Sequence, residues 1–193
     1  MKIAVVLPSR GHPVRLHAVI TALDHLASGQ HEVSYHVVAD DDDDDTQAMG
    51  KGPKPWIHMH SGPTTIGLHA RINNVVRVLV IDLYVDAVTF IADDTFPLAM
   101  NWDARIAGGI EQGLCAFAWQ ELNDPQNVTY PVLSRIWLKT LGYAFPEWFP
   151  FWFADTWIAS VHQLAFAKSF PIVQNLSLGG KRGKTRGLRD LKF

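Results

Sequence analysis

Short runs of β-branched and aromatic residues, separated by stretches of helical periodicity, constrain the fold of this chain more than any other feature. The strand-like runs are "KIAVVLP" at 2–8, "EVSYHVVAD" at 32–40 and "AVTFIAD" at 87–93. Two segments between them repeat apolar residues at helical spacing: one opens at Pro13 and stops at Gly29, and the other is "TTIGLHARINNVVRVLV" at 64–80. Because strands alternate with helices, the pattern favours the α/β class, with a mostly parallel central sheet flanked by helices.

The remaining sequence extends the same alternation. It predicts strands at 56–60 and 114–121, helices at 101–113, at 131–142 and from 154 onward, and a polar loop at 41–55. No internal repeat or linker interrupts the 193 residues, so one domain spanning 1–193 is expected, long enough to bury a real core.

Charge and cysteine content limit the partners and the cellular compartment expected for this protein. A net charge of −2 argues against a nucleic-acid partner. The basic tail at 179–193 is expected either to be mobile or to close over a diphosphate. The single cysteine, Cys115, permits no intramolecular disulfide, and the sequence has neither a signal peptide nor an apolar span of transmembrane length. A cytoplasmic protein without a transmembrane segment is therefore expected.

Acidic residues follow two of the predicted strands at the point where each strand ends. Asp40 and Asp41 follow the second strand, and Asp93 and Asp94 stand side by side at the end of the third. Ligands of open parallel sheets bind beyond the carboxyl ends of the strands. Convergent carboxylates there suit Mn²⁺ or Mg²⁺, which usually completes its shell with substrate phosphates. The alternative is that these acids are solvated loop residues.

Five motifs occur in the order found in GT-A glycosyltransferases: "VLPSRGHPVRL", "VVADDDD", "GLHARINNV", "FIADDTFPLAMNWD" and "FWFADTW". The chain most resembles the family 2-like enzymes of bacteria and phages, over roughly residues 3 to 160. The resemblance implies a single GT-A-like domain with hexosyltransferase-like activity. Such an enzyme moves a sugar from a nucleotide-sugar donor, of the UDP or GDP type, to a hydroxyl of an unknown glycan, lipid or protein acceptor.

The resemblance also implies where the nucleotide base binds. Pro8, Ser9 and Arg10, together with Asp40 or Asp41, match the pocket that holds the base, where a carboxylate can accept the ring N–H. Six consecutive aspartates exceed the one to three usual in the family. Which of them meets the base therefore stays open.

Diphosphate and metal roles follow from the next two motifs. Arg71 resembles the arginine that reaches the diphosphate or the sugar, although alone it would read as a helix-surface residue. Isoleucine follows it where the pattern has asparagine, so Asn73 or Asn74 is a candidate for that role. In the DxD-type metal motif, Asp94 would ligate the cation and Asp93 would contact ribose or metal-bound water.

Asp155 resembles the catalytic base of inverting members. A base is required because the acceptor hydroxyl must lose its proton as it attacks. Apolar aromatic neighbours would raise the pKa and the basicity of this carboxylate. An N-cap role is the structural alternative. Asp103 matches a less critical position, which a first-turn acid on the helix dipole explains equally well.

Two further groups have open roles. The aromatic stretch from 143 to 157 could provide an acceptor platform through Trp148 or Trp152, but core packing and a homodimer surface are alternatives. His58 and His60 would share one face of a strand, and nothing nearby completes a zinc ligand set at a recognisable spacing.

Two other functions compete with sugar transfer. A nucleotidyltransferase would use similar carboxylates but normally needs a glycine-rich basic loop after the first strand, and "PSRGHPVR" holds one glycine. A non-catalytic nucleotide-sugar-binding protein is the third hypothesis, because the chain ends without a long acceptor-binding extension.

Overall fold

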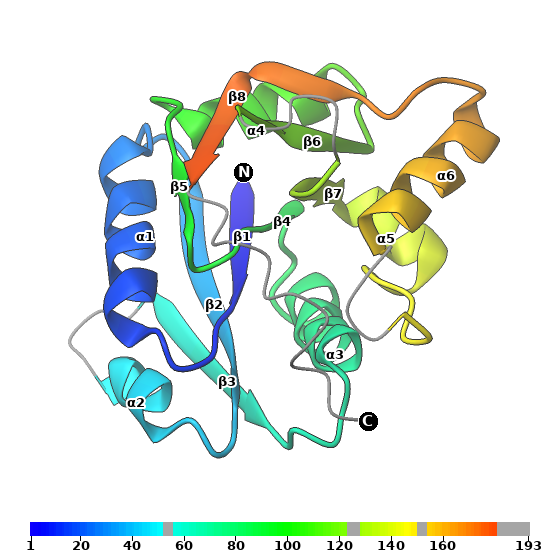
Figure 1. Cartoon of the computed structure of the whole chain (residues 1–193). Coiled ribbons are helices and arrows are strands. Elements are labelled where there is room, and N and C mark those ends of the chain that lie inside the picture. The colour runs from blue at the N-terminus through cyan, green and yellow to red at the C-terminus, as the bar shows by residue number, and fades with distance from the viewer. Residues whose placement is uncertain (52–55, 123–127, 150–153, 181–193) are drawn as a thin grey trace.

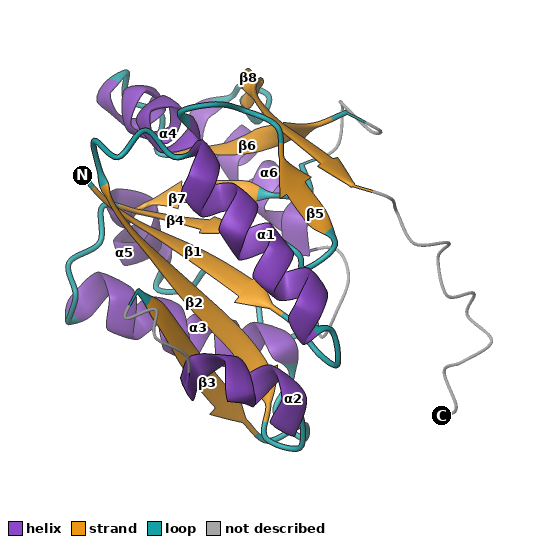
Figure 2. Cartoon of the chain, turned by 90° about the vertical axis from the view of Figure 1, so that its left-hand side faces the viewer, coloured by secondary structure: helices purple, strands orange, loops and turns teal. Residues whose placement is uncertain are grey.

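A computed structural model describes residues 1–51, 56–122, 128–149 and 154–180 as a central sheet with helices on both faces (Figure 1; Figure 2). The strands are β1 (Lys2–Pro8), β2 (Glu32–Asp40), β3 (Ile57–Gly62), β4 (Ala87–Phe90), β5 (Thr95–Pro97), β6 (Ala116–Glu121), β7 (Pro131–Ser134) and β8 (Ile172–Gly180). The helices are α1 (Pro13–Leu26), α2 (Asp44–Gln47), the 3₁₀ helix η1 (Ala48–Lys51), α3 (Leu68–Ile81), α4 (Trp102–Glu111), α5 (Arg135–Leu141) and α6 (Ala154–Phe166). The expected α/β class is confirmed.

The sheet combines a parallel half with a mixed half. Its strand order in the described residues is β3-β2-β1-β4-β7-β6-β8-β5. Strands β3, β2, β1 and β4 run parallel, β7 is antiparallel to both β4 and β6, and β5 is antiparallel to β8. Because β1 lies between β2 and β4, the carboxyl ends of these three strands open at one edge of the sheet.

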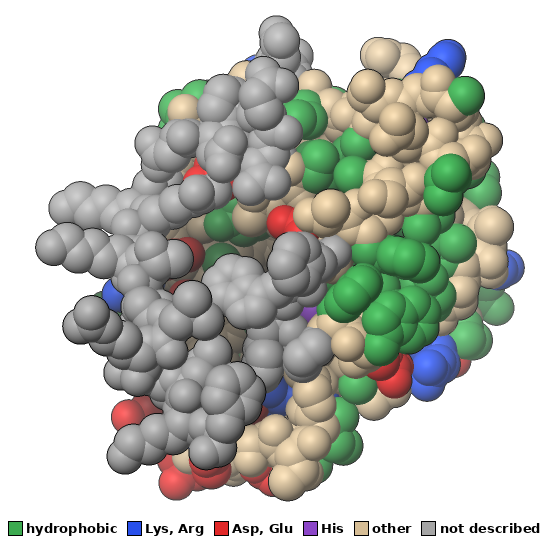
Figure 3. Space-filling model, turned by 45° about the vertical axis from the view of Figure 1, so that its right-hand side comes forward, with side chains coloured by type: hydrophobic (Ala, Val, Ile, Leu, Met, Phe, Trp, Pro, Cys, Tyr) green, Lys and Arg blue, Asp and Glu red, His purple; other side chains and the backbone are tan. Residues whose placement is uncertain are grey.

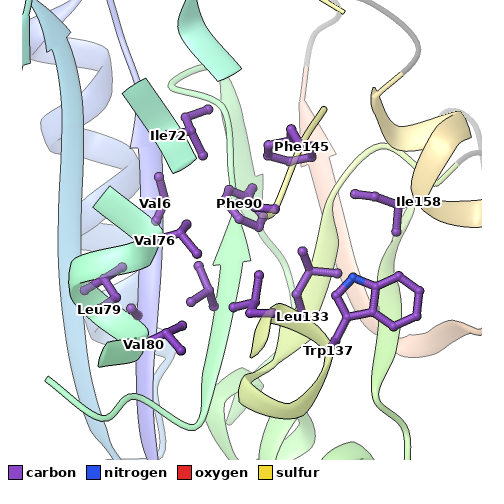
Figure 4. Packing of buried hydrophobic residues seen from close by; sticks show 14 of the residues in the cluster. Val6, Ile72, Val76, Leu79, Val80, Phe90, Leu133, Trp137, Phe145 and Ile158 are labelled. Atoms are coloured by element: carbon purple, nitrogen blue, oxygen red, sulfur yellow. The ribbon is translucent and has the colours of Figure 1, made fainter. Parts of the chain in front are cut away.

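Helices cover both faces of the sheet, as the uninterrupted apolar run of β1 predicts. On one face, α1 and α4 pack against the strands. On the other, Ile72 and Val76 of α3 pack with Val6, Phe90 and, from α5, Trp137 (Figure 4). All five strand residues from Ile3 to Leu7 are fully buried. No helix of the described segments is long and apolar enough to cross a membrane.

The segment 131–142 corrects a sequence prediction. We expected one helix from Pro131, but residues 131–134 form β7, and only 135–141 are helical. The four strand residues are buried between β4 and β6, and Ser134 caps α5 by accepting a hydrogen bond from the Trp137 N–H at 3.2 Å. Pairing on both sides therefore outweighs the helix-start signal of the proline.

Other boundaries also differ from expectation. The predicted loop at 41–55 contains α2 and η1, because Asp43 caps α2 and Asp44 and Asp45 occupy its first turn, where the helix dipole favours acids. Strand β4 ends at Phe90, three residues earlier than predicted. Gly179 and Gly180 belong to β8 rather than to a basic tail, whose remainder at 181–193 lies outside the described residues.

Candidate active site

The loop after β1 joins the acidic ends of β2 and β4. Ser9 donates a hydrogen bond from its hydroxyl to a carboxylate oxygen of Asp93 at 2.6 Å. Its neighbour Arg10 forms ion pairs with Asp40 and Asp42. The sequence predicted that acids from separate strand ends would converge, and this convergence is observed.

Asp40 and Arg71 form a largely buried ion pair. Asp40 is 6% exposed, and its Oδ1 lies 2.5 Å from Nη2 of Arg71. Nη1 of Arg71 donates to the carbonyl of Ala39 at 2.9 Å. The resemblance assigned these two side chains to opposite ends of a nucleotide, whereas the structure places them in direct contact beyond β2. A role for Arg71 at the diphosphate stays a prediction.

The rest of the aspartate run divides between structural and exposed positions. Asp43 accepts hydrogen bonds from the N–H groups of Gly11 (2.8 Å) and Thr46 (3.2 Å). Its burial raises the pKa, but the hydrogen bonds from Thr46 and Gly11 outweigh burial and lower the pKa overall. Asp42 is tied to Arg10, and Asp41 is exposed. Asp40 and Asp41 therefore remain the candidates that could meet a base.

Asp93 and Asp94 lie in the turn between β4 and β5. Asp94 accepts a hydrogen bond from the Thr95 hydroxyl at 3.3 Å, and that hydroxyl lies 2.7 Å from the Tyr130 hydroxyl. Within the described residues, neither carboxylate forms an ion pair with a lysine or arginine. Adjacent carboxylates without a basic partner suit a hard divalent cation.

Protein ligands alone would not complete the shell of such a cation. No group of three or more His, Cys, Asp or Glu residues positioned to hold a metal occurs in the described segments. Mg²⁺ and similar cations often take one or two carboxylates from the protein and the rest from phosphates and water. The pair Asp93–Asp94 fits that donor set.

A cavity of about 260 Å³ lies beside these acids, at the ends of β1 and β4. Its wall includes Pro8, His69, Tyr130, Phe145 and Asp155. Figure 3 shows acidic side chains within a hollow on one face of the molecule, next to a group of hydrophobic side chains. The cavity thus brings the predicted base pocket, through Pro8, together with the predicted catalytic carboxylate.

Asp155 lies in the first turn of α6. It is the second residue of the helix, after buried Ala154, rather than a cap preceding it. Its Oδ1 accepts a hydrogen bond from the Thr156 N–H at 2.7 Å, while Oδ2 has no hydrogen-bond partner in the described part of the chain. One oxygen is therefore oriented by the helix, and the other is left for a ligand.

His69 is a site residue that the sequence analysis missed. It lies in the first turn of α3, is 7% exposed and lines the cavity that contains Asp155. Burial lowers its pKa, opposed by the backbone carbonyls of Phe149 and Pro146 and by the Asp155 carboxylate. The sequence held one signal for it: His69 stands four residues before Asn73, so the two side chains share one helix face.

Two residues weighed in the sequence have structural roles instead. Asp103 is fully buried and accepts hydrogen bonds from the Ser28 N–H (2.7 Å) and hydroxyl (2.6 Å). Asn73 is 3% exposed and hydrogen-bonds to the backbone of 144–145. Both side chains are therefore engaged in holding the fold. Of the predicted acceptor platform, Trp148 is exposed and Trp152 lies outside the described residues.

His58 and His60 do share a face of β3, and both contact His36 of β2. Nδ1 of His36 lies 3.0 Å from Nε2 of His60, and the His36 and His58 rings stack with centroids 4.7 Å apart. Only 1% of His36 is exposed. Burial, reinforced by the two neighbouring imidazoles, lowers the pKa of His36 to about 3.

This histidine is expected to make the protein less stable in acid. The unfolded chain binds a proton near pH 6.5 and the folded chain only near pH 3, so stability is complete above about pH 6.5 and falls as the pH drops. The loss approaches about 1.4 kcal/mol per pH unit within that window. Urea unfolding of His36→Gln at pH 7 and pH 5 is expected to show a smaller difference than wild type. Exposed His17→Gln is the control, and an unchanged difference in His36→Gln would contradict the assignment.

The sheet topology and the acidic crevice define the GT-A type of fold found in glycosyltransferases. The chain is similar to the mannosyltransferase PcManGT from Pyrobaculum calidifontis, solved in complex with GDP-Man and Mn²⁺, with a TM-score of 0.68 and 14% identity over 94% of this chain. It is also similar to S. aureus TarS 1–349, with a TM-score of 0.68 and 13% identity over 93% of this chain. The chain spans 58% and 60% of those two structures. No family model and no curated protein matches the sequence.

Proposed function

We propose that this domain is a glycosyltransferase that moves a sugar from a nucleotide-diphosphate donor to an acceptor hydroxyl. The observation that carries the proposal is the convergence of Asp40, Asp93 and Asp155, from three separate parts of the chain, around the end of β1 and the loop that follows it. The similarity to a fold solved with GDP-Man and Mn²⁺ supports a nucleotide-sugar donor and a divalent cation.

On the donor side, the loop at Pro8, Ser9 and Arg10 binds the nucleotide, with Asp40 or Asp41 accepting the ring N–H of the base. The buried contact with Arg71 supports Asp40 in this role, because the arginine fixes the direction of the carboxylate. UDP and GDP both present such a ring N–H.

On the diphosphate side, Asp94 ligates Mn²⁺ or Mg²⁺, and Asp93 binds ribose or a metal-bound water. The hydrogen bond from Ser9 leaves one oxygen of Asp93 available for that contact. When bound, the cation supplies Lewis-acid stabilisation of the departing nucleoside diphosphate.

At the acceptor side, Asp155 takes the proton of the attacking hydroxyl. The acceptor oxygen bonds to the anomeric carbon while the bond from that carbon to the diphosphate breaks, and the electron pair leaves with the phosphate. A single displacement of this kind inverts the anomeric configuration. The cavity beside Asp155 supports this assignment, since it is open to the donor side at Pro8.

The first test is cation-dependent nucleotide binding. GDP and UDP, each with Mn²⁺, are tested for a rise in the melting temperature of the wild type. At a free nucleotide concentration of 100 times Kd, the expected gain in the free energy of unfolding is about 2.7 kcal/mol. EDTA is expected to remove most of it. Asp94→Asn is expected to abolish the cation-dependent part, whereas Asp44→Asn, an exposed acid in α2, keeps it. A wild type that binds neither nucleotide, with or without Mn²⁺, would end the proposal.

A further inference from the structure

His69 presents one ring nitrogen to the cavity and uses the other to hold itself in place. Its Nδ1 is hydrogen-bonded to the backbone carbonyl of Phe149. A carbonyl oxygen only accepts, so Nδ1 carries the proton. In the neutral ring, Nε2 is then an acceptor, which the neighbouring Pro146 backbone carbonyl cannot satisfy because a carbonyl donates no hydrogen bond.

The segment that receives this hydrogen bond is itself fixed to α3. Asn73, one turn beyond His69, accepts hydrogen bonds from the N–H groups of Ala144 (2.9 Å) and Phe145 (3.1 Å). Its amide donates to the carbonyl of Phe145 at 2.7 Å. Because Asn73 is almost fully buried, these bonds are shielded from water, and the Phe149 carbonyl is held where it orients the His69 ring.

Burial lowers the pKa of His69, and the charge of a nearby carboxylate opposes that shift. Asp155 of α6 lies close enough for its carboxylate to stabilise an imidazolium. The segment before α6 adds exposed Glu147, which accepts a hydrogen bond from Asn73 at 3.3 Å. On α3 itself, the Arg71 charge is paired with Asp40. Asp155 is therefore the charged group identified beside the histidine in the described residues.

We propose that His69 binds the attacking hydroxyl of the acceptor through Nε2, beside Asp155; this inference rests on the proposed function. The hydroxyl donates its hydrogen bond to Nε2 in the ground state. As the acceptor oxygen bonds to the anomeric carbon and the diphosphate leaves, the proton passes to the His69–Asp155 pair, and the imidazole shares it with the carboxylate. Protonated His69 cannot accept that hydrogen bond, so the free ring is the active form.

His69→Asn separates this role from mere anchoring. The asparagine amide nitrogen stands the same number of bonds from the backbone as Nδ1, so it retains a donor for the Phe149 carbonyl but has no acceptor at the position of Nε2. Donor hydrolysis is measured with GDP-mannose and UDP-glucose, each with Mn²⁺ and with water as the acceptor. We expect kcat to fall by about 10²-fold. Nucleotide affinity is expected to stay within about 2-fold of wild type, and the variant to lose one group from the acid limb of the pH–rate profile. His17→Asn, exposed on α1, is the control.

A kcat of His69→Asn within about twofold of wild type, with nucleotide binding intact, would overturn the role of His69 alone. A wild type that binds no nucleotide overturns the proposed function and this inference together. If the wild type binds nucleotide but hydrolyses neither donor, histidine ¹⁵N NMR at pH 7 decides, with the His69 signals assigned by their loss in His69→Asn. Protonation on Nδ1 with a free Nε2 supports the proposal, and the Nε2–H tautomer or an imidazolium refutes it.

Discussion

Replacing Asp155 with asparagine is expected to lower sugar transfer by about 10²- to 10⁴-fold, the range typical of losing a general base. The amide has nearly the shape of the carboxylate and can still accept the hydrogen bond from the Thr156 N–H. It cannot take up a proton at neutral pH. Asp155 lines the cavity, and its hydrogen bonds within the described residues go to Thr156 rather than to Ser9 or Asp93, so nucleotide affinity is expected to be unchanged.

Turnover of GDP-mannose and UDP-glucose, followed together with nucleotide binding, measures this effect. Asp82→Asn, an exposed acid at the end of α3, is the matched control and should retain wild-type turnover. An Asp155→Asn variant with wild-type turnover would place the base elsewhere. Nucleotide binding by a wild type that turns over no donor would favour a non-catalytic binding protein.

Replacing Asp40 with asparagine is expected to destabilise the fold by about 3 kcal/mol or more, because it leaves a buried cation without its counter-charge. The Arg71 side chain is only 13% exposed, and its Nη2 loses the carboxylate that it contacts. Asp42→Asn removes a carboxylate that is 55% exposed and paired with an exposed arginine, so it should cost less than about 1 kcal/mol.

Urea unfolding at pH 7 compares these variants. The double variant Asp40→Asn with Arg71→Met is expected to recover part of the lost stability, since it removes the isolated charge. Equal losses in Asp40→Asn and Asp42→Asn would show that the Asp40–Arg71 pair contributes no more than a surface contact.

The best sequence predictions concern elements whose burial is periodic along the chain. Strands 2–8 and 32–40 match the structure to the residue, and the helices predicted at 13–29 and 64–80 differ from α1 and α3 only at their ends. In each of these elements, the spacing of the apolar residues alone shows which positions are buried. Strands β5, β7 and β8 were not predicted in this way. Their state depends on which strand lies beside them, and β7 is a strand because β4 and β6 pair with it on both sides.

Some residues of the site could likewise be predicted from the sequence, and others could not. The acids at the ends of β2 and β4 could be predicted, because parallel strands of one sheet end at one edge. The contact between Asp40 and Arg71 joins residues 31 positions apart, and the hydrogen bond from His69 reaches Phe149 across 80 positions. No local sequence pattern predicts a contact between residues so far apart in the chain.

The amino-acid sequence by itself determined the α/β class, the principal helices and strands, and the presence of carboxylates where a parallel sheet opens. Those features depend on hydrophobic periodicity and strand direction, which are local properties. Only the tertiary structure decided that Arg71 braces Asp40, that Asn73 is buried against 144–145, and that His69 and Asp155 line one cavity. Such contacts form between side chains brought together by packing, so they exist only after the helices have docked on the sheet.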